Sequence, residues 1–299
     1  MNNKLISKLF KTTLILFFVL TIYTIPTLKK EEKVLRTNLE IGDVTDIPTT
    51  TIYLLDKNNF LVQDKIFIKT ENKEEIVREI FKYLTKDNND IPIGLNTYIT
   101  KDIRIQNIEI ENDLIKLDLS KELLNSENIE TIIIGLTYSL IKIDGINNLK
   151  ITVDNKPIDN YNKLLNKKLG INNNYSYTKR KDINKTVIYY LDNINENYYY
   201  VPVTKYLNDT REKIEIIIDE LKNNDNNELI SPLNNKTKLL NYKEESNVLF
   251  LNFNKYLLDK NDEMNDKIQD IIAYSAFDNY DVDMVMFEIN GKELRYIKK

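Results

Sequence analysis

The sequence predicts an α+β protein made of two tandem repeats, each a mostly antiparallel or mixed sheet with two helices packed on it. Two observations predict this class. A residue pattern that runs from position 51 to 158 returns between positions 187 and 294. Within each copy, strand-like and helix-like apolar periodicities follow one another in the same order. A repeat of this length is too long for a solenoid unit, so each copy is expected to be a domain with its own core.

The two copies stay in step along their length. Tyr53 in the opening segment corresponds to Tyr189, an offset of 136 (189 minus 53). The run 114–124 corresponds to 248–258 at an offset of 134 (248 minus 114), and the closing segment 153–156 corresponds to 289–292. We therefore predict this organisation: a cytoplasmic N-terminus and membrane anchor or signal segment at 1–28, a spacer at 29–49, domain 1 at 50–158, a basic Asn- and Lys-rich linker at 159–185, and domain 2 at 186–299.

Each repeat is expected to contain strand, strand, helix, strand, strand, helix and strand. Asn72 followed by Glu75 marks the start of the first helix, and Asp209 with Glu212 marks the matching start in copy two. Alternating apolar and polar residues favour strands with one solvated face. In copy one the predicted strands and helices cover 52–55, 61–68, the helix after Asn72, 103–110, 114–119, a helix from about 128 to 143, and 149–153.

Composition excludes several classes of function. The net charge of -4 and pI near 5.3 argue against a nucleic-acid partner and offer no general attraction for acidic substrates. The chain has no cysteine and no histidine, so disulfides, thiol nucleophiles and histidine-based catalysis or zinc sites are impossible. No glycine-rich phosphate loop is present. We therefore expect no catalytic residue, no metal site, no cofactor and no small-molecule substrate.

The N-terminal segment has the pattern of a membrane-targeting sequence. Lys4, Lys8 and Lys11 precede an apolar run at 12–25, and a basic pair follows at 29–30. The run is near the lower limit for a spanning helix and has no evident cleavage site, which favours an uncleaved anchor over a cleaved signal peptide. The lysines before it predict a single-pass protein whose domains lie on the extracytoplasmic side. A buried core helix is the alternative interpretation.

Residues 163–185 are strongly basic, with six Lys and Arg180 against Asp182, a local net charge of +6. This pattern is typical of a solvated linker, and contact with an anionic polymer is the alternative.

Four short motifs of copy one belong together, at 53–56, 91–94, 117–124 and 144–154. They resemble the GerMN domain of bacterial sporulation and germination proteins. The resemblance covers nearly all of the chain outside the anchor and linkers, and it implies a compact αβ domain outside the membrane with no recognised active site. It also implies other envelope or sporulation proteins as partners. The signature positions, all expected to be structural, are Tyr53, Asp56, Pro92, Gly94, Asp118, Leu119, Ser120, Lys121 and Gly145.

Copy two departs from this pattern. Asn252 stands where copy one has Asp118, and the run Ser231-Pro232-Leu233 lacks the glycine seen at Gly94. Asp118 with Glu122 is a possible carboxylate pair, which would point to a wall hydrolase. The structural alternative is that Asp118 and Ser120 end a strand and cap the next turn. Because the pair is not repeated in copy two, we favour the structural role.

Tyrosines are concentrated on the opening hairpin of copy two. Tyr side chains suit half-buried strands and also interfaces. Strand alternation must direct some of these rings outward, so Tyr198 and Tyr200 are the candidate partner surface. The sequence thus favours a non-catalytic, membrane-anchored scaffold or assembly protein, with a cell-wall polymer-binding module as the alternative.

Overall fold

A computed structural model describes residues 48–86, 90–176 and 183–299, and residues 48–299 form one compact unit. The predicted anchor at 1–28 and most of the spacer at 29–49 lie outside the described residues. The elements, in chain order, are β1 (Thr49–Leu55), β2 (Leu61–Phe67), α2 (Lys73–Tyr83), β3 (Ile105–Glu111), β4 (Leu114–Leu119), the 3-10 helix η2 (Lys121–Asn125), α3 (Ile129–Leu140), β5 (Asn148–Val153), β6 (Lys156–Pro157), η3 (Lys167–Leu169), β7 (Asn174–Ser176), β8 (Ile183–Ile194), β9 (Asn197–Asn208), α4 (Lys213–Lys222), β10 (Leu239–Glu245), β11 (Val248–Phe253), η4 (Lys255–Leu257), α5 (Asp266–Asn279), β12 (Met284–Ile289) and β13 (Lys292–Lys298).

Each repeat has the same mixed four-stranded sheet. In the first, β3-β4-β5-β6 are neighbours, with β4 and β5 parallel and the other pairs antiparallel. In the second, β10-β11-β12-β13 repeat this order and these directions. The predicted α+β class with two repeats is therefore confirmed.

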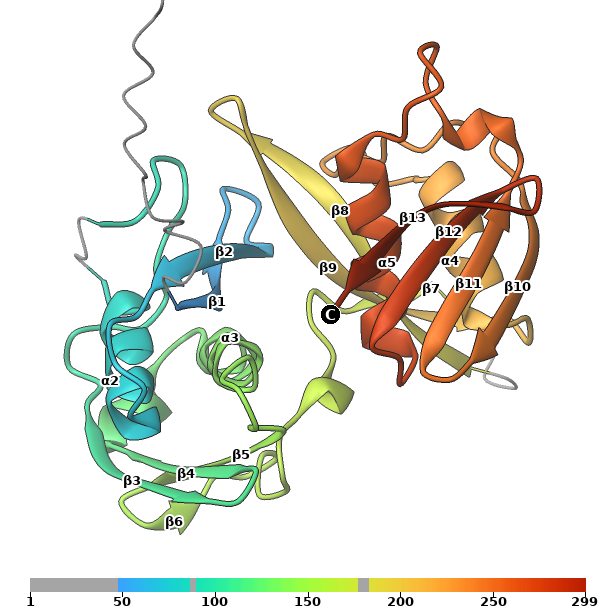
Figure 1. The fold of residues 1–299 in the computed structure, drawn as a ribbon. Coiled ribbons are helices and arrows are strands. Elements are labelled where there is room, and N and C mark those ends of the chain that lie inside the picture. The colour runs from blue at the N-terminus through green and yellow to red at the C-terminus, as the bar shows by residue number, and fades with distance from the viewer. Residues whose placement is uncertain (1–47, 87–89, 177–182) are drawn as a thin grey trace, which may run out of the picture. The chain divides into compact units, whose positions relative to one another are not determined.

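The helices of each repeat lie between two layers of strands (Figure 1). Helix α3 contacts β1 on one side and β5 on the other, and α5 contacts both β8 and β12. We had expected a single sheet with helices on it; instead, the opening hairpin separates from the four-stranded sheet and covers the opposite side of the helices. The apolar character of α3 explains this, because every residue from Ile132 to Leu140 is buried.

The start signals of the helices are largely where the sequence placed them. The Asn72 side chain accepts hydrogen bonds from the backbone N–H groups of Glu74 and Glu75, which caps α2. In copy two the cap is Glu212, paired with Glu215 in a capping box, and not Asp209. Asp209 instead accepts hydrogen bonds from the backbone N–H and the guanidinium of Arg211.

A five-stranded sheet joins the two repeats. It has the order β1-β2-β9-β7, and β8 pairs with the other side of β9. The hairpins meet at one antiparallel pair, Gln63 with Tyr200. Close by, the Asn172 side chain accepts from Leu61 N–H and donates to the carbonyls of Leu61 and Pro202, at 2.8 to 2.9 Å. Main-chain pairing and one amide side chain thus connect β2 with β9.

The buried side chains of the two repeats form one continuous hydrophobic cluster. The expectation of a separate core in each repeat is therefore wrong. The reason lies in the opening hairpins. Tyr53 of the first and Tyr189 of the second are both buried, and their side chains lie close enough to interact with each other. The hairpins cover each other as well as their own helices, so the interior runs through both repeats.

The segment expected to be a solvated linker is ordered over its described part. Leu165 and Ile171 are buried, and β7 pairs in parallel with β9. Two apolar anchors within an Asn- and Lys-rich background are enough to fix this segment. The expectation of a solvated linker is therefore wrong for residues 163–174.

Candidate functional site

The signature residues Asp118 and Ser120 hold turns. The Asp118 carboxylate accepts from the Thr152 hydroxyl at 2.5 Å and from Asn155 N–H at 2.9 Å, so it caps the turn between β5 and β6. Ser120 Oγ accepts from Arg104 N–H at 3.0 Å. Both groups therefore satisfy backbone amides, in agreement with the structural interpretation.

Copy two performs the same tasks with asparagine. Asn252 Oδ1 accepts from Gly291 N–H at 2.9 Å, in the turn between β12 and β13. Asn254 Oδ1 accepts from Lys238 N–H at 3.1 Å, as Ser120 does from Arg104. These departures from the family pattern are chemically conservative, because each replacement keeps an acceptor oxygen at the required position.

The proposed carboxylate pair of Asp118 and Glu122 is not brought together. Asp118 is buried and directed at the β5–β6 turn, whereas Glu122 is partly exposed and lies in η2. The Ser120 hydroxyl lowers the pKa of Glu122. Neither contact resembles a pair of carboxyl groups facing a shared substrate. The remaining members of this motif are structural or solvated, since Leu119 is fully buried and Lys121 is exposed.

Tyr53 and Asp56 lie in the buried region between the hairpins. Tyr53 N–H donates to Ser139 Oγ, and in copy two Tyr189 N–H donates to Ser275 Oγ. Asp56 Oδ1 accepts from the N–H groups of Asn58 and Phe60 and so caps the β1–β2 turn. Its other oxygen is buried without a hydrogen-bond partner among the described residues, as is the matching oxygen of Asp192.

The loop with Pro92 and Gly94 contacts the other repeat. Pro92 C=O accepts from Leu95 N–H, and Gly94 has a φ of +94°. A Cβ at Gly94 would lie 2.5 Å from Cγ2 of Ile194, in the β8–β9 turn. Gly94 therefore permits a close inter-repeat approach, and Gly145, with a φ of +71°, ends the turn after α3.

The two candidate tyrosines have different environments. Tyr198 is 44% exposed, and the Lys267 ammonium lies over its ring at 4.4 Å. Tyr200 is half-buried, donates its hydroxyl to Asp270 and packs edge-on against Tyr274 at 5.1 Å between ring centres. The Tyr200 side chain thus packs on α5 of its own repeat, and its backbone pairs with Gln63 of the other repeat. Tyr198 alone remains a candidate for an exposed partner surface.

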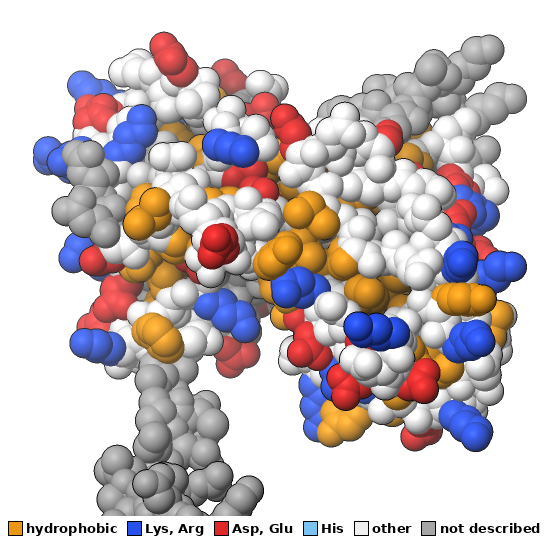
Figure 2. Space-filling view, turned by 90° about the horizontal axis from the view of Figure 1, so that it is seen from above, with side chains coloured by type: hydrophobic (Ala, Val, Ile, Leu, Met, Phe, Trp, Pro, Cys, Tyr) orange, Lys and Arg blue, Asp and Glu red, His pale blue; other side chains and the backbone are white. Residues whose placement is uncertain are grey.

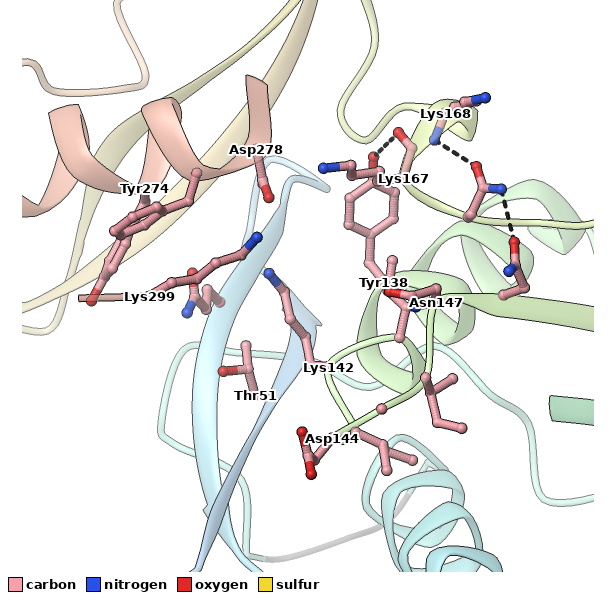
Figure 3. Close-up of a pocket in the computed structure, with 18 of the residues that line it drawn as sticks. Thr51, Tyr138, Lys142, Asp144, Asn147, Lys167, Lys168, Tyr274, Asp278 and Lys299 are labelled. Carbon is pink, nitrogen blue, oxygen red and sulfur yellow. Dashed lines mark hydrogen bonds between the residues drawn. The ribbon is translucent and has the colours of Figure 1, made fainter. Parts of the chain in front are cut away.

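Residues of both repeats line a cleft of about 820 Å³ (Figure 3). Its walls come from β1 and β2, the end of α3 with the turn after it, η3, α5 and the end of β13. Lysine is the commonest residue type in the lining. The charged lining residues are Lys65, Lys142, Lys167, Lys168, Lys298, Lys299, Asp144 and Asp278.

The charges in the cleft are unbalanced. All six lysines are exposed, and none forms an ion pair with a described residue. The Tyr53 hydroxyl and the Asp278 carboxylate raise the pKa of Lys142, so this ammonium stays charged at neutral pH. Tyr189 donates to Asp278 at 2.8 Å, which occupies one carboxylate oxygen. The cleft therefore presents excess positive charge to solvent.

Hydrogen bonds position the basic rim of the cleft. The Tyr138 hydroxyl donates to Lys167 C=O at 3.0 Å, and Asn166 links Lys168 N–H to the Asn148 side chain (Figure 3). Behind the rim, Lys185 donates to the carbonyl of Lys168, and burial lowers the pKa of Lys185 to about 8. The backbone that carries two of the lysines is therefore held in place.

Sequence reasoning missed this cleft. The overall charge of -4 gave no sign of a basic site, because the six lysines lie in four separate parts of the chain. Only Lys167 and Lys168 belong to the basic segment 163–185. Figure 2 shows acidic and basic side chains mixed over one face of the molecule, with no field of a single sign. The sequence pattern could have placed Lys142 at the end of the buried helix. It could not have shown that the other five lysines lie near it.

The fold and its signature residues define a class: tandem αβ repeats in which paired hairpins join two mixed sheets. The family model described as sporulation and spore germination, Germane, matches residues 51–159 and again 187–295, so the chain belongs to this family. It is 24% identical to the spore germination protein GerM of Bacillus subtilis strain 168, over 81% of this chain and 71% of that protein.

A solved structure of the tandem GerMN domains of the B. subtilis sporulation protein GerM has a similar fold. The TM-score is 0.74 at 22% identity, and the match covers 82% of this chain and 92% of that one. This likeness supports the arrangement of two repeats described above.

In residues 48–86, 90–176 and 183–299 no helix is both long and apolar enough to cross a bilayer. The same ranges hold no group of three or more metal-binding side chains.

Proposed function

We propose that this protein is a non-catalytic scaffold, anchored in the membrane by residues 1–28 with its repeats on the extracytoplasmic side. In this role it contributes to a sporulation or germination envelope complex through protein–protein contacts. Membership of the Germane family supports the biological process, and the relative named spore germination protein GerM supports the same setting.

One observation carries the non-catalytic part of the proposal. The polar signature residues are used for turns and hairpin contacts: Asp118 and Ser120 bind backbone amides, and Asp56 caps a turn. A residue that touches a reacting substrate must be accessible to it. Because Asp118 and Asp56 are buried, a wall hydrolase built on them receives no support.

The partner surface is proposed on the tip of the β8–β9 hairpin, around Tyr198. Large exposed aromatic side chains contribute strongly to protein interfaces. A photo-crosslinking residue at Tyr198 in the full-length protein should capture an envelope protein in sporulating cells, whereas the same residue at Lys150, on the exposed sheet of repeat 1, should not. Equal capture at both positions would contradict the assignment of this surface.

The cellular role can be tested by deletion. Loss of the gene should lower spore formation or germination by at least about tenfold, and the full chain should restore it. A version with residues 1–28 replaced by a cleavable secretion signal should fail, because it releases the repeats from the membrane. Added protease should degrade residues 48–299 in protoplasts. Protection of this region would overturn the proposed orientation, and muropeptide release by the protein would overturn its non-catalytic character.

A further inference from the structure

We infer that the lysine-lined cleft binds a phosphate-bearing polyol polymer of the cell envelope, a flexible chain of repeated phosphodiester and hydroxyl groups. This inference is independent of the scaffold role, since the cleft lies apart from Tyr198 and its failure would leave the protein contacts untouched. The sequence analysis placed polymer contact in the basic segment 163–185; the cleft uses only two lysines of that segment.

The first support is charge. Six lysines against two aspartates leave an excess of four positive charges in the cleft, within a chain whose net charge is -4. Lysines gathered at this density repel one another unless an anion lies between them. Asp278 attracts Lys142, but the other five lysines form no ion pair with a described residue, so their ammonium groups are available to a ligand. The repeats thus place uncompensated charge around one hollow.

The second support is the kind of cation. The cleft holds lysine and no arginine. Lysine is a strongly hydrated point charge that binds phosphate without a fixed geometry, whereas the planar fork of arginine holds carboxylates and phosphates in a fixed bidentate geometry. Lysine is depleted in protein–protein interfaces. A volume of about 820 Å³ also has the size of a ligand pocket and not of a protein docking face. These features favour a polymer segment over an acidic protein.

The third support is the uncharged lining. The side chains of Thr51, Gln63 and Asn147 make no hydrogen bond with a described residue, although each can donate and accept. They are suited to the hydroxyl groups of a polyol. The partly exposed ring of Tyr274 supplies flat apolar surface. Hydrogen bonding fixes the rim beneath Lys167 and Lys168, which reduces the ordering cost of binding.

The test measures binding of fluorescent poly(glycerol phosphate) to the full-length protein in nanodiscs of zwitterionic lipid. The cleft variant carries Lys65→Gln, Lys168→Gln and Lys298→Gln. The control carries Lys57→Gln, Lys150→Gln and Lys260→Gln, at exposed positions outside the cleft. Both change the net charge from -4 to -7, since each loses three lysines. We expect the cleft variant to bind about tenfold more weakly and the control within about twofold of the wild type.

Three results would overturn the inference: no binding of poly(glycerol phosphate) at low salt, an equal loss of affinity in both variants, or tighter binding of poly-glutamate or a DNA oligonucleotide than of this polymer. Raising the salt concentration should weaken wild-type binding, because exposed charges are screened. The single variant Lys168→Gln, at an exposed position, serves if the triple variant does not fold, and it should still weaken binding severalfold.

Discussion

At the scale of single residues, the two repeats use different side chains for the same backbone. Asp118 in copy one and Asn252 in copy two each cap the turn after the following strand, and Ser120 and Asn254 each bind an amide on the neighbouring strand. The sequence could predict that Asp118 was structural, because the pair with Glu122 was not repeated. It could not predict which turn Asp118 caps, since that turn lies more than thirty residues further on.

Asp56 and Asp192 occupy the same position in the two repeats and lie beside each other in the buried region between the hairpins. Burial, together with the neighbouring Asp192 carboxyl, raises the pKa of Asp56 to about 6 from its ordinary value of 3.8. Each residue has one buried carboxyl oxygen without a donor. Two acceptor oxygens that face each other need a proton between them.

This pair predicts a pH dependence of stability. The folded state holds the Asp56 proton more tightly than the unfolded state, so its contribution is complete below about pH 4 and is lost as pH rises through about 6. The variant Asp56→Asn supplies a permanent donor to Asp192. We expect it to flatten the urea-unfolding profile between pH 4 and 7 and to raise stability at pH 7.5 by on the order of 1 kcal/mol.

Asp118→Asn is the matched control, because it leaves the Asp56–Asp192 pair in place and should keep the wild-type slope. If Asp56→Asn shows the same pH slope as the wild type, the two carboxyl groups do not share a proton.

At the scale of elements, most helices and strands could be predicted from the sequence. Apolar periodicity and the Asn72 cap were sufficient for α2, and β3, β4 and β5 of the first mixed sheet matched their patterns. Strand β13 was missed because its residues are mainly exposed, which leaves no buried face to produce alternation. The segment 163–174 was predicted to be a solvated linker because most of its residues are polar. The two buried apolar residues that anchor it, Leu165 and Ile171, are too few to change that prediction.

The loop before β3 shows how one element constrains another. The β8–β9 turn reaches Gly94, and Asn195 Nδ2 donates to Ile93 C=O at 2.8 Å. The positive φ of Gly94 alone would disfavour a side chain there, and the contact with Ile194 adds a steric reason.

Gly94→Ala and Gly291→Ala should separate these effects. Gly291 also has a positive φ, of +80°, but a Cβ there would meet nothing within 4 Å. We expect Gly291→Ala to cost about 1–2 kcal/mol from backbone strain and Gly94→Ala to cost a further 1–3 kcal/mol from overpacking against Ile194. Urea denaturation of both variants measures the difference. Equal losses would show that the hairpin does not press on this loop in solution.

At the scale of the whole molecule, the shared interior changes what the duplication means. Self-similarity in the sequence correctly predicted two repeats, but it could not show that their opening hairpins cover each other. The apolar positions of a hairpin look the same whether they face their own helix or another repeat. The cleft could not be predicted from the sequence either, because its lysines come close to one another only when the two repeats pack together.

A continuous interior predicts that residues 48–299 unfold together. Asn172→Ala removes hydrogen bonds to Leu61 and Pro202 and should lower stability by about 2–4 kcal/mol. Hydrogen exchange in both four-stranded sheets should then accelerate to a similar extent. Asn166→Ala, which removes contacts to Asn148 and Lys168 only, should affect its own neighbourhood. Acceleration confined to one sheet in Asn172→Ala would indicate that the repeats unfold separately.

The unlike residues at matching positions have a consequence for how the two halves fit together. Lys142 corresponds to Asp278 at the repeat offset (278 minus 142 is 136), and the two attract each other. Two copies of the first half would bring ammonium against ammonium, and two of the second half would bring carboxylate against carboxylate. Each half is therefore complementary in charge to the other half of the same polypeptide and is a poor match for the same half of a neighbouring molecule.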